Sequence, residues 1–248
     1  MLAFSIPYHK RAIPLYWTVV SPDDYSPHVL ERESIRRFLM AVPRRLRPKL
    51  VFVADRGFAD VEFFRFLMKL RIKFVIRICG KVFINSRRYK GWVKRIPLSP
   101  GKVRWLPDVV YHRAKPMTVN LLLKYEQDDP LYIATTIDCA ETVLRTYARR
   151  MRIEESFRDI KDGLLFKRLR LSHADKVGKM LLAGVLVYLF ALMIGSQAEK
   201  HPELIKVISL LPRTKNAKKL LSVFRIGLII ITRCPSTNFP LHLVPEAL

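Results

Sequence analysis

A short apolar run, followed by a helix-like and a second strand-like segment, constrains the fold of this chain more than any other feature. Leu50–Ala54 has the sequence LVFVA and ends at Asp55, and Lys73–Cys79 has the sequence KFVIRIC. Between them, Ala59–Arg71 spaces its apolar residues as an amphipathic helix does. The order strand, helix, strand predicts a parallel crossover unit. The unbroken apolar run predicts that Leu50–Ala54 is a central strand buried on both faces. The chain is therefore expected to have an α/β fold.

The remaining segments predict how this core is organised. Leu2–Tyr8 and Ala12–Val20 are strand-like, and Val29–Ala41 is helix-like. From Gly80 to about Ile137, short β-like runs alternate with turn signals, which predicts a β-rich insertion. Glu141–Leu165 is predicted to be one long helix. We therefore expect four parts: the first part of the core over 1–79, the β-rich insertion over 80–137, the second part of the core over 138–200, and a basic C-terminal tail over 201–248.

The charge of the chain predicts a polyanionic partner. The formal net charge is +24 over 248 residues, while half of the residues are hydrophobic and can form a core. Nucleic acid is the first candidate and an anionic membrane surface is the second. The three cysteines, Cys79, Cys139 and Cys234, form no CxxC pair and indicate reduced thiols in a cytoplasmic protein.

One segment allows two interpretations. Met180–Ala198 contains no charged residue and is close to the length that crosses a membrane. The alternative is a helix buried on all sides of a globular core. The globular character of the neighbouring sequence favours the core helix, and no membrane partner is expected.

Asp55 is the first candidate for chemistry. A carboxylate at the C-terminal end of a central strand is where α/β sheets place functional groups. An aspartate that only caps the turn into the next helix explains the same residue equally well.

The second candidate is the segment 147–161. At about 100° per residue, Tyr147, Arg150, Glu154 and Lys161 fall within an arc of roughly 60° on one helix. A solvated charged face with i,i+4 pairs is the alternative. One acidic residue among cations and an aromatic residue, a second acidic residue at a strand end, and a strongly basic chain together favour phosphodiester chemistry on DNA. In that chemistry carboxylates hold divalent metal ions, and Arg, Lys and Tyr hold phosphates.

These residues resemble a known family. The spacing Tyr147-x2-Arg150-x3-Glu154-x6-Lys161 resembles the tyrosine–arginine–glutamate–lysine signature of the insertion-sequence-four family of bacterial DDE transposases. Asp55-Arg56-Gly57-Phe58 resembles the block that carries the second catalytic aspartate of that family. The segments 11–17 and 218–227 are similar to two further blocks.

The resemblance implies a ribonuclease-H-like mixed sheet with helices, interrupted by a β-rich insertion. It implies that Asp55 and Glu154 are catalytic and bind Mg²⁺, for which Mn²⁺ can substitute. It also implies that the DNA-binding residues are Tyr147, Arg150, Lys161, Arg56 and Arg158. The partners would be double-stranded transposon ends and target DNA, bound by a homodimer.

The sequence departs from the family pattern at one point. The first catalytic aspartate belongs on a strand upstream of Leu2, so we expect this chain to lack it, together with the N-terminal DNA-binding region of the family. Magnesium-dependent cleavage and strand transfer would then be impaired. A non-catalytic DNA-binding transposase fragment is the main alternative. Another nuclease with a ribonuclease-H-like fold, such as a resolvase, and a membrane-associated basic protein are the others.

Overall fold

A computed structural model describes residues 2–8, 10–20, 26–125, 130–164, 173–200 and 222–233. The chain divides into two compact units. The sheet unit is Tyr25–Met151, and the hairpin unit is Met1–Asp24 together with Arg152–Leu248. Most of the predicted C-terminal tail, 201–248, lies outside the described residues, which include only 222–233 of it.

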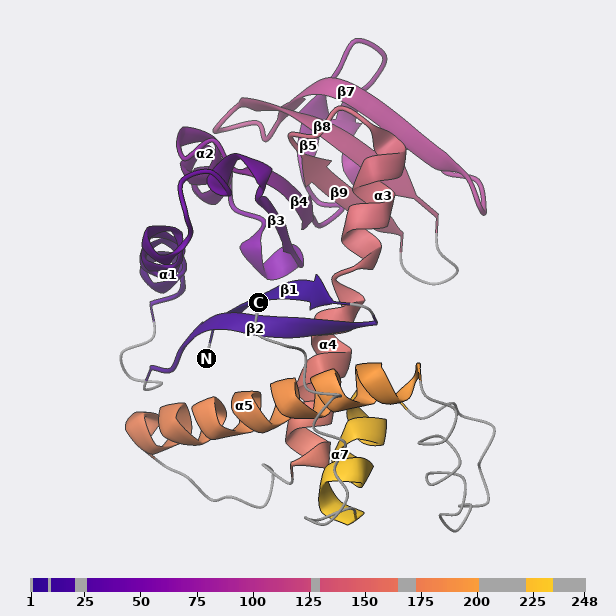
Figure 1. The fold of residues 1–248 in the computed structure, drawn as a ribbon. Helices are drawn as coiled ribbons and strands as arrows, with labels where there is room; N and C mark the ends of the chain where they lie inside the picture. Colours follow the sequence, from indigo (N-terminus) through magenta and orange to yellow (C-terminus); the bar gives the residue numbers. More distant parts are fainter. Residues whose placement is uncertain are drawn as a thin grey trace. The chain divides into compact units, whose positions relative to one another are not determined.

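The sheet unit is built on one mixed sheet of seven strands among its described residues (Figure 1). Their order is β3-β4-β9-β8-β7-β5-β6. Only β3 and β4 are parallel, with Val51 opposite Lys73, and all other neighbours are antiparallel. The strands are β3 (Val51–Ala54), β4 (Lys73–Arg77), β5 (Phe83–Asn85), β6 (Lys90–Trp92), β7 (Val103–Tyr111), β8 (Met117–Lys124) and β9 (Leu131–Thr135).

Helix α2 (Val61–Lys69) makes the predicted parallel crossover between β3 and β4. Asp60 caps its N-terminus, because the Asp60 carboxylate accepts a hydrogen bond from the Phe63 amide at 2.9 Å. Phe64 of α2 stacks on Phe74 of β4 with ring centroids 4.7 Å apart, and both rings are fully buried. Helix α1 (Pro27–Ala41) precedes this crossover, and the 3₁₀ turn Arg47–Lys49 leads into β3.

Helix α3 (Ala140–Ala148) packs on the face of the sheet opposite to the one that α2 covers. Val143 lies in one buried cluster with Val75 of β4 and Leu122 of β8. Val75 and its neighbour Phe74 point to opposite faces, as successive residues of a strand do. The sheet is therefore covered by helices on both faces at β4, as an α/β fold requires. The α/β prediction is confirmed, and the mixed sheet is consistent with a ribonuclease-H-like domain.

One detail differs from what the sequence predicted. Among the described residues, β3 is an edge strand of the sheet, with β4 as its neighbour, and Val51 is exposed. The prediction of a central strand buried on both faces is therefore wrong for these residues. In addition, the strands of 80–137 continue the core sheet, because β9 pairs directly with β4 at Ile76 and Ala134. The predicted boundaries of the four parts stay predictions.

The hairpin unit contains β1 (Leu2–Tyr8), β2 (Arg11–Thr18), the main part of α4 (Met151–Arg158), a π-helix (Asp159–Gly163), α5 (Ala174–Ala198) and α7 (Val223–Arg233). Strands β1 and β2 form an antiparallel hairpin with Ile6 opposite Ile13. Ile160, Tyr188 and Phe224 are the centre of its core, against which Trp17 of β2 is packed.

Helices α5 and α7 cross closely because two glycines lie at their contact. A Cβ atom at Gly195 of α5 would stand 1.9 Å from the carbonyl oxygen of Val223. A Cβ atom at Gly227 of α7 would stand 1.8 Å from the carbonyl oxygen of Ala191. No other residue type fits either position without moving a helix backbone.

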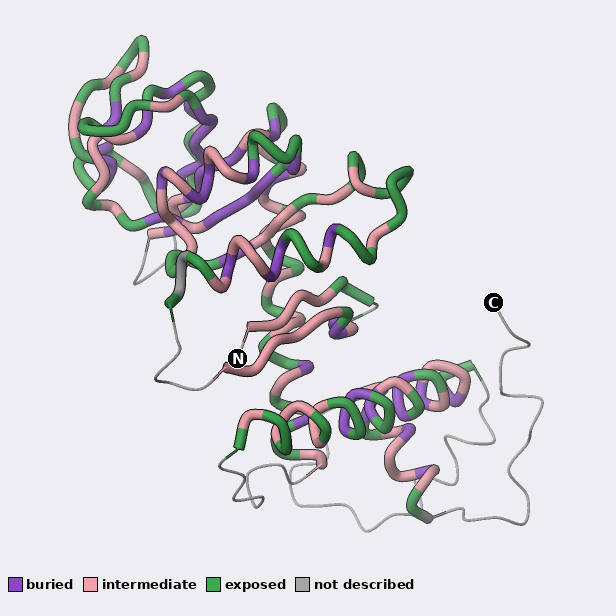
Figure 2. Tube along the Cα trace, turned by 90° about the vertical axis from the view of Figure 1, so that its left-hand side faces the viewer, coloured by how far each residue is buried: buried purple, intermediate pink, exposed green. Residues whose placement is uncertain are grey.

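Helix α5 is long and apolar enough to cross a membrane, and 28% of its most apolar stretch is buried. Along α5, buried and exposed residues alternate (Figure 2). Tyr188 and Leu192 are buried in the core, whereas Leu186 and Phe190 are exposed. In the hairpin unit taken by itself, α5 is therefore packed on one face, and the prediction of burial on all sides is wrong. Such a helix by itself is weak support for a membrane span, because core helices of soluble proteins also meet this criterion.

Candidate functional site

Asp55 stands where β3 ends and a 3₁₀ turn, Arg56–Phe58, begins. One carboxylate oxygen, Oδ1, accepts a hydrogen bond from the Gly57 amide at 3.0 Å. The side chain is half exposed, at 51%. The turn-capping role that the sequence allowed is thus present, and it uses one oxygen. The second oxygen, Oδ2, is directed toward a cation of the signature segment.

That cation is Arg150. Its Nη1 lies 3.8 Å from Oδ2 of Asp55, and the Arg150 side chain is only 17% exposed. The guanidinium carbon also lies 5.9 Å from the centroid of the Tyr147 ring, within the range of a cation–π contact. The structure therefore brings together three of the predicted site residues, all of them in the sheet unit.

The position of Arg150 follows from how α3 is anchored. Tyr147, in the last turn of α3, packs against the buried cluster that contains Val143 and Val75. The helix ends at Ala148, and the Arg150 amide donates to the Tyr147 carbonyl oxygen at 2.9 Å. This tight turn directs the guanidinium back over the Tyr147 ring and toward the end of β3.

The same turn corrects the predicted helix over 141–165. The structure has α3, a turn at Arg149 and Arg150, then α4, and finally the π-helix Asp159–Gly163. A single regular helix would have placed four signature residues within one arc. The break at 149–150 and the wider π turn invalidate a uniform rotation of 100° per residue.

The other predicted site residues on this segment belong to the hairpin unit. Glu154 and Arg158 of α4 are exposed, and as residues four apart they share one face of the helix. Lys161 is exposed on the π-helix. Arg56, in the sheet unit, is exposed in the turn after Asp55. All the predicted DNA contacts except Tyr147 and Arg150 are therefore exposed residues, and their roles stay predictions.

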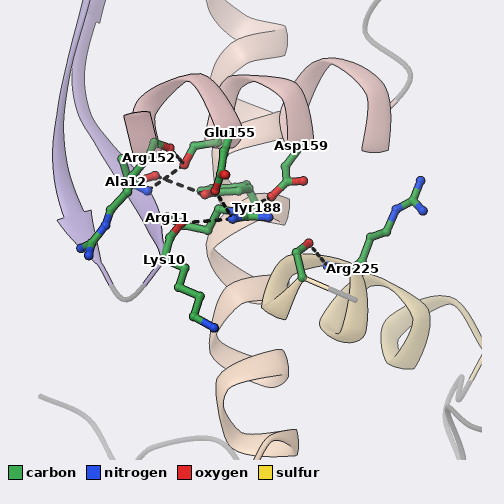
Figure 3. Close-up of polar contacts among 10 residues, drawn as sticks. Lys10, Arg11, Ala12, Arg152, Glu155, Asp159, Tyr188 and Arg225 are labelled. Atoms are coloured by element: carbon green, nitrogen blue, oxygen red, sulfur yellow. Dashed lines mark hydrogen bonds and ion pairs between the residues drawn. The ribbon is translucent and has the colours of Figure 1, made fainter. Parts of the chain in front are cut away.

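Sequence reasoning missed a group of polar contacts that holds α4 and the π-helix to strand β2 (Figure 3). Arg11 of β2 bridges Glu155 and Asp159, with N–O distances of 2.5 and 2.6 Å. The Ala12 amide donates to the Ser156 hydroxyl oxygen at 2.7 Å. These partners are 144 residues or more apart along the chain, and no local pattern in a single sequence connects them.

A comparison with protein families is consistent with this arrangement. A family model described as "Transposase DDE domain" matches residues 20–190, which is more than half of the chain. The chain belongs to this family. No curated protein matches it. The matched residues of the transposase domain include both Asp55 and the whole segment from Tyr147 to Lys161. Family membership implies a function in DNA transposition and, with it, binding to DNA.

DDE transposases generally use a divalent metal, so the residues at Asp55 can be tested for such an ion. The half-exposed carboxylate, fixed through Oδ1 by a backbone amide, is the kind of oxygen ligand that Mg²⁺ takes. The described residues, however, contain no group of three or more His, Cys, Asp or Glu side chains that could hold a metal ion. The Asp55 carboxylate is therefore a suitable ligand for a divalent ion, but the described residues do not gather enough ligands to hold one.

Proposed function

We propose that this chain is a transposase of the insertion-sequence-four type, which cleaves DNA at the ends of an insertion sequence and joins those ends to target DNA. The observation that carries the proposal is the approach of Arg150 to Asp55, 3.8 Å between Nη1 and Oδ2. It joins the signature segment to the aspartate block at one place, although the sequence alone left each of them with an ordinary structural explanation.

The chemistry proposed for the residues follows from their charge and exposure. Asp55 and Glu154 are the catalytic carboxylates, and a divalent ion such as Mg²⁺, when bound, supplies activation of the attacking oxygen and stabilisation of the leaving one. Arg150 and Tyr147 hold a phosphate beside Asp55. The Arg150 guanidinium already faces the Asp55 carboxylate, and guanidinium groups bind phosphate oxygens by the same charge-assisted hydrogen bonds. Lys161, Arg56 and Arg158 make further backbone contacts with DNA.

Hydrolysis of one strand would consume water and leave a 3′-hydroxyl and a 5′-phosphate. The 3′-hydroxyl would then attack a phosphodiester of the target, forming a new phosphodiester bond while the target strand's bond to its own 3′-oxygen breaks and that oxygen leaves as a 3′-hydroxyl. We further propose that the chain acts in the bacterial cytoplasm as a homodimer on double-stranded DNA. The net charge of +24 supports a DNA partner, because release of counterions from DNA strengthens binding by a basic surface.

The proposal names two catalytic carboxylates, whereas a DDE set has three. Cleavage by this chain on its own is therefore expected to be weak. The same observation supports a second candidate function, that of a non-catalytic fragment which binds transposon DNA. The two functions share their DNA contacts and differ only in strand cleavage.

The DNA contact of Arg150 is tested with fluorescence anisotropy of a labelled duplex at several salt concentrations. Arg150→Gln is expected to weaken binding and to make the slope of log K against log salt shallower by about 0.9, the effect of losing one phosphate contact. Arg149→Gln is the matched control, because it removes the same charge from an exposed neighbour outside the signature. If the two variants lose the same affinity and the same slope, Arg150 has no special contact and only total charge matters.

Cleavage is tested on the same duplex with Mg²⁺ or Mn²⁺, by resolving nicked strands on a denaturing gel. A weak metal-dependent nick that disappears in Asp55→Asn and in Glu154→Gln supports the transposase assignment. Salt-dependent binding without any nick supports the non-catalytic fragment. Absence of DNA binding contradicts both functions.

A further inference from the structure

Two consecutive residues of β2 contact one face of the segment that carries Glu154. Arg11 reaches Glu155 and Asp159, which lie four residues apart, and the Ala12 amide bonds to the hydroxyl of Ser156 between them. Figure 3 shows Glu155 and Asp159 directed toward the Arg11 side chain of β2. The contacts span the junction of α4 with the π-helix, so they hold both pieces to one strand.

Ala12 is also held through its carbonyl group. The Tyr188 hydroxyl of α5 donates to the Ala12 carbonyl oxygen at 3.2 Å, and Tyr188 is fully buried. The Ser156 hydroxyl in turn donates to the Arg152 carbonyl oxygen one helical turn earlier, at 2.8 Å. Strand β2 is therefore held between α5 and α4, and the polar groups at this point have partners.

The ionic contacts are largely removed from solvent. The side chains of Arg11 and Asp159 are 14% and 15% exposed, while that of Glu155 is 48% exposed. Burial raises the pKa of Asp159, and the Arg11 guanidinium opposes this rise. The charge of Glu155 also raises the pKa of Asp159, and that of Arg225 lowers it. The charge of Asp159 in turn raises the pKa of Tyr188. A buried ion pair of this kind contributes little net stability compared with apolar residues, and its best-attested use is to fix one arrangement.

We propose that Arg11 is a positioning residue, which fixes the rotation of α4 about its own axis and thereby the direction in which Glu154 points. The proposal rests on the catalytic function proposed for Glu154. Neighbouring residues of an α-helix are about 100° apart, so turning Glu155 toward β2 sends Glu154 to a different side of the helix. There it is exposed beside Arg158. Arg11 acts through Glu155 and Asp159 and contacts no reacting group.

The rotation of α4 is measured by the distance between two spin labels in the full chain, with pulsed electron paramagnetic resonance. The labels are attached through Arg158→Cys on α4 and Leu182→Cys on α5, both exposed, after Cys79, Cys139 and Cys234 are replaced by serine. The parent is expected to give one narrow peak, and Arg11→Gln is expected to lose it in favour of a broad distribution. Lys10→Gln, which removes the adjacent exposed charge, is the matched control and should keep the narrow peak.

A folded Arg11→Gln protein that keeps the narrow peak overturns the proposal. If Arg11→Gln does not fold, the double variant Arg11→Gln, Asp159→Asn decides instead, because it leaves no unpaired buried charge and still lacks the bridge to Glu155. A narrow peak in that variant overturns the proposal, and a broad one supports it.

A second measurement separates positioning of Glu154 from a purely structural contact. Binding of Mn²⁺ is followed by loss of its free-ion resonance, in Arg11→Gln, Glu154→Gln and the double variant. If Arg11 acts through Glu154, the two single losses in affinity do not add, and the double variant binds no more weakly than Glu154→Gln. Additive losses, or a loss in Glu154→Gln alone, assign Arg11 a structural role only. If Glu154→Gln changes nothing, the metal assignment in the proposed function fails, while the distance measurement still decides whether Arg11 positions α4.

Discussion

Replacement of Gly227 by alanine gives a direct test of how α5 and α7 are packed. The added Cβ atom would stand 1.8 Å from the carbonyl oxygen of Ala191, whereas real Cβ atoms essentially never come closer than 3.0 Å to such an atom. The difference, 3.0 minus 1.8, is 1.2 Å. The obstacle is backbone, so no side chain rotation relieves the clash, and the two helices have to separate by about that distance.

The expected cost follows from this separation. A gap of up to 1 Å already removes a quarter to a half of the dispersion energy of each contact across an interface. Overpacking of this kind costs about 1–3 kcal/mol, and a backbone clash belongs at the upper end. Alanine in place of glycine in a helix returns about 1 kcal/mol. We therefore expect Gly227→Ala to destabilise the hairpin unit by about 2 kcal/mol.

The same substitution at Gly178 is the control, because nothing lies within 4 Å of a Cβ atom at that position of α5. There only the helix propensity counts, and a gain of about 1 kcal/mol is expected. Urea unfolding is followed by the fluorescence of Trp17, which packs against the core of the hairpin unit. Trp92 and Trp105 are replaced by phenylalanine so that they do not contribute.

The two variants should move the unfolding midpoint in opposite directions, by a difference of about 3 kcal/mol in the free energy of unfolding. An unchanged or raised midpoint for Gly227→Ala would refute the close crossing of α5 and α7. A loss of equal size at Gly178 would show that the effect has nothing to do with the contact.

Two further predictions concern stability. Asn120→Leu should lower the free energy of unfolding of the sheet unit by about 2–4 kcal/mol, since it removes the acceptor for the Asp108 amide and a donor to the Ile137 carbonyl at a buried site; an unchanged urea midpoint, followed at Trp105, would contradict it. Arg11→Gln should cost more stability at pH 8 than at pH 5. The folded pKa of Asp159 is already raised by burial and rises further without Arg11, so its ionisation is increasingly unfavourable in the folded state as pH increases above the unfolded value of about 3.9. Unfolding curves of the variant and its parent at both pH values test this, and an equal cost at the two would rule it out.

Much of the fold could be predicted from periodicity and composition. The strand at Lys73, the helix at Val61 and the parallel crossover that joins β3 to β4 were all indicated by local patterns. The sheet neighbours of β3 were not, because an apolar run shows that a strand can be buried without showing which strands lie beside it. Val51 lies in the edge strand β3 and is exposed, although its sequence context is typical of a central strand.

The geometry of the candidate site could not be predicted from the sequence. The spacing from Tyr147 to Lys161 contains no proline, and its first glycine follows at Gly163, so nothing local indicates that the helix breaks at Arg149. Packing of Tyr147 against the sheet core accompanies that break and directs Arg150 toward Asp55. The contact of Arg11 with Asp159 depends on residues so far apart in the chain that only the folded structure could reveal it.

The pairing of β2 with α4 also has a consequence for synthesis of the protein. The hairpin of β1 and β2 is synthesised before α4, because the Ser156 hydroxyl that accepts the Ala12 hydrogen bond follows 144 residues later. At translation rates of about 5–20 residues per second, roughly 7–30 seconds pass between synthesis of the strand and synthesis of its helix. During that time Trp17 and Ile13 have no core to enter, since Tyr188 and Phe224 are made later still. Whatever shields this hairpin in the cell must therefore act before α4, α5 and α7 have been made.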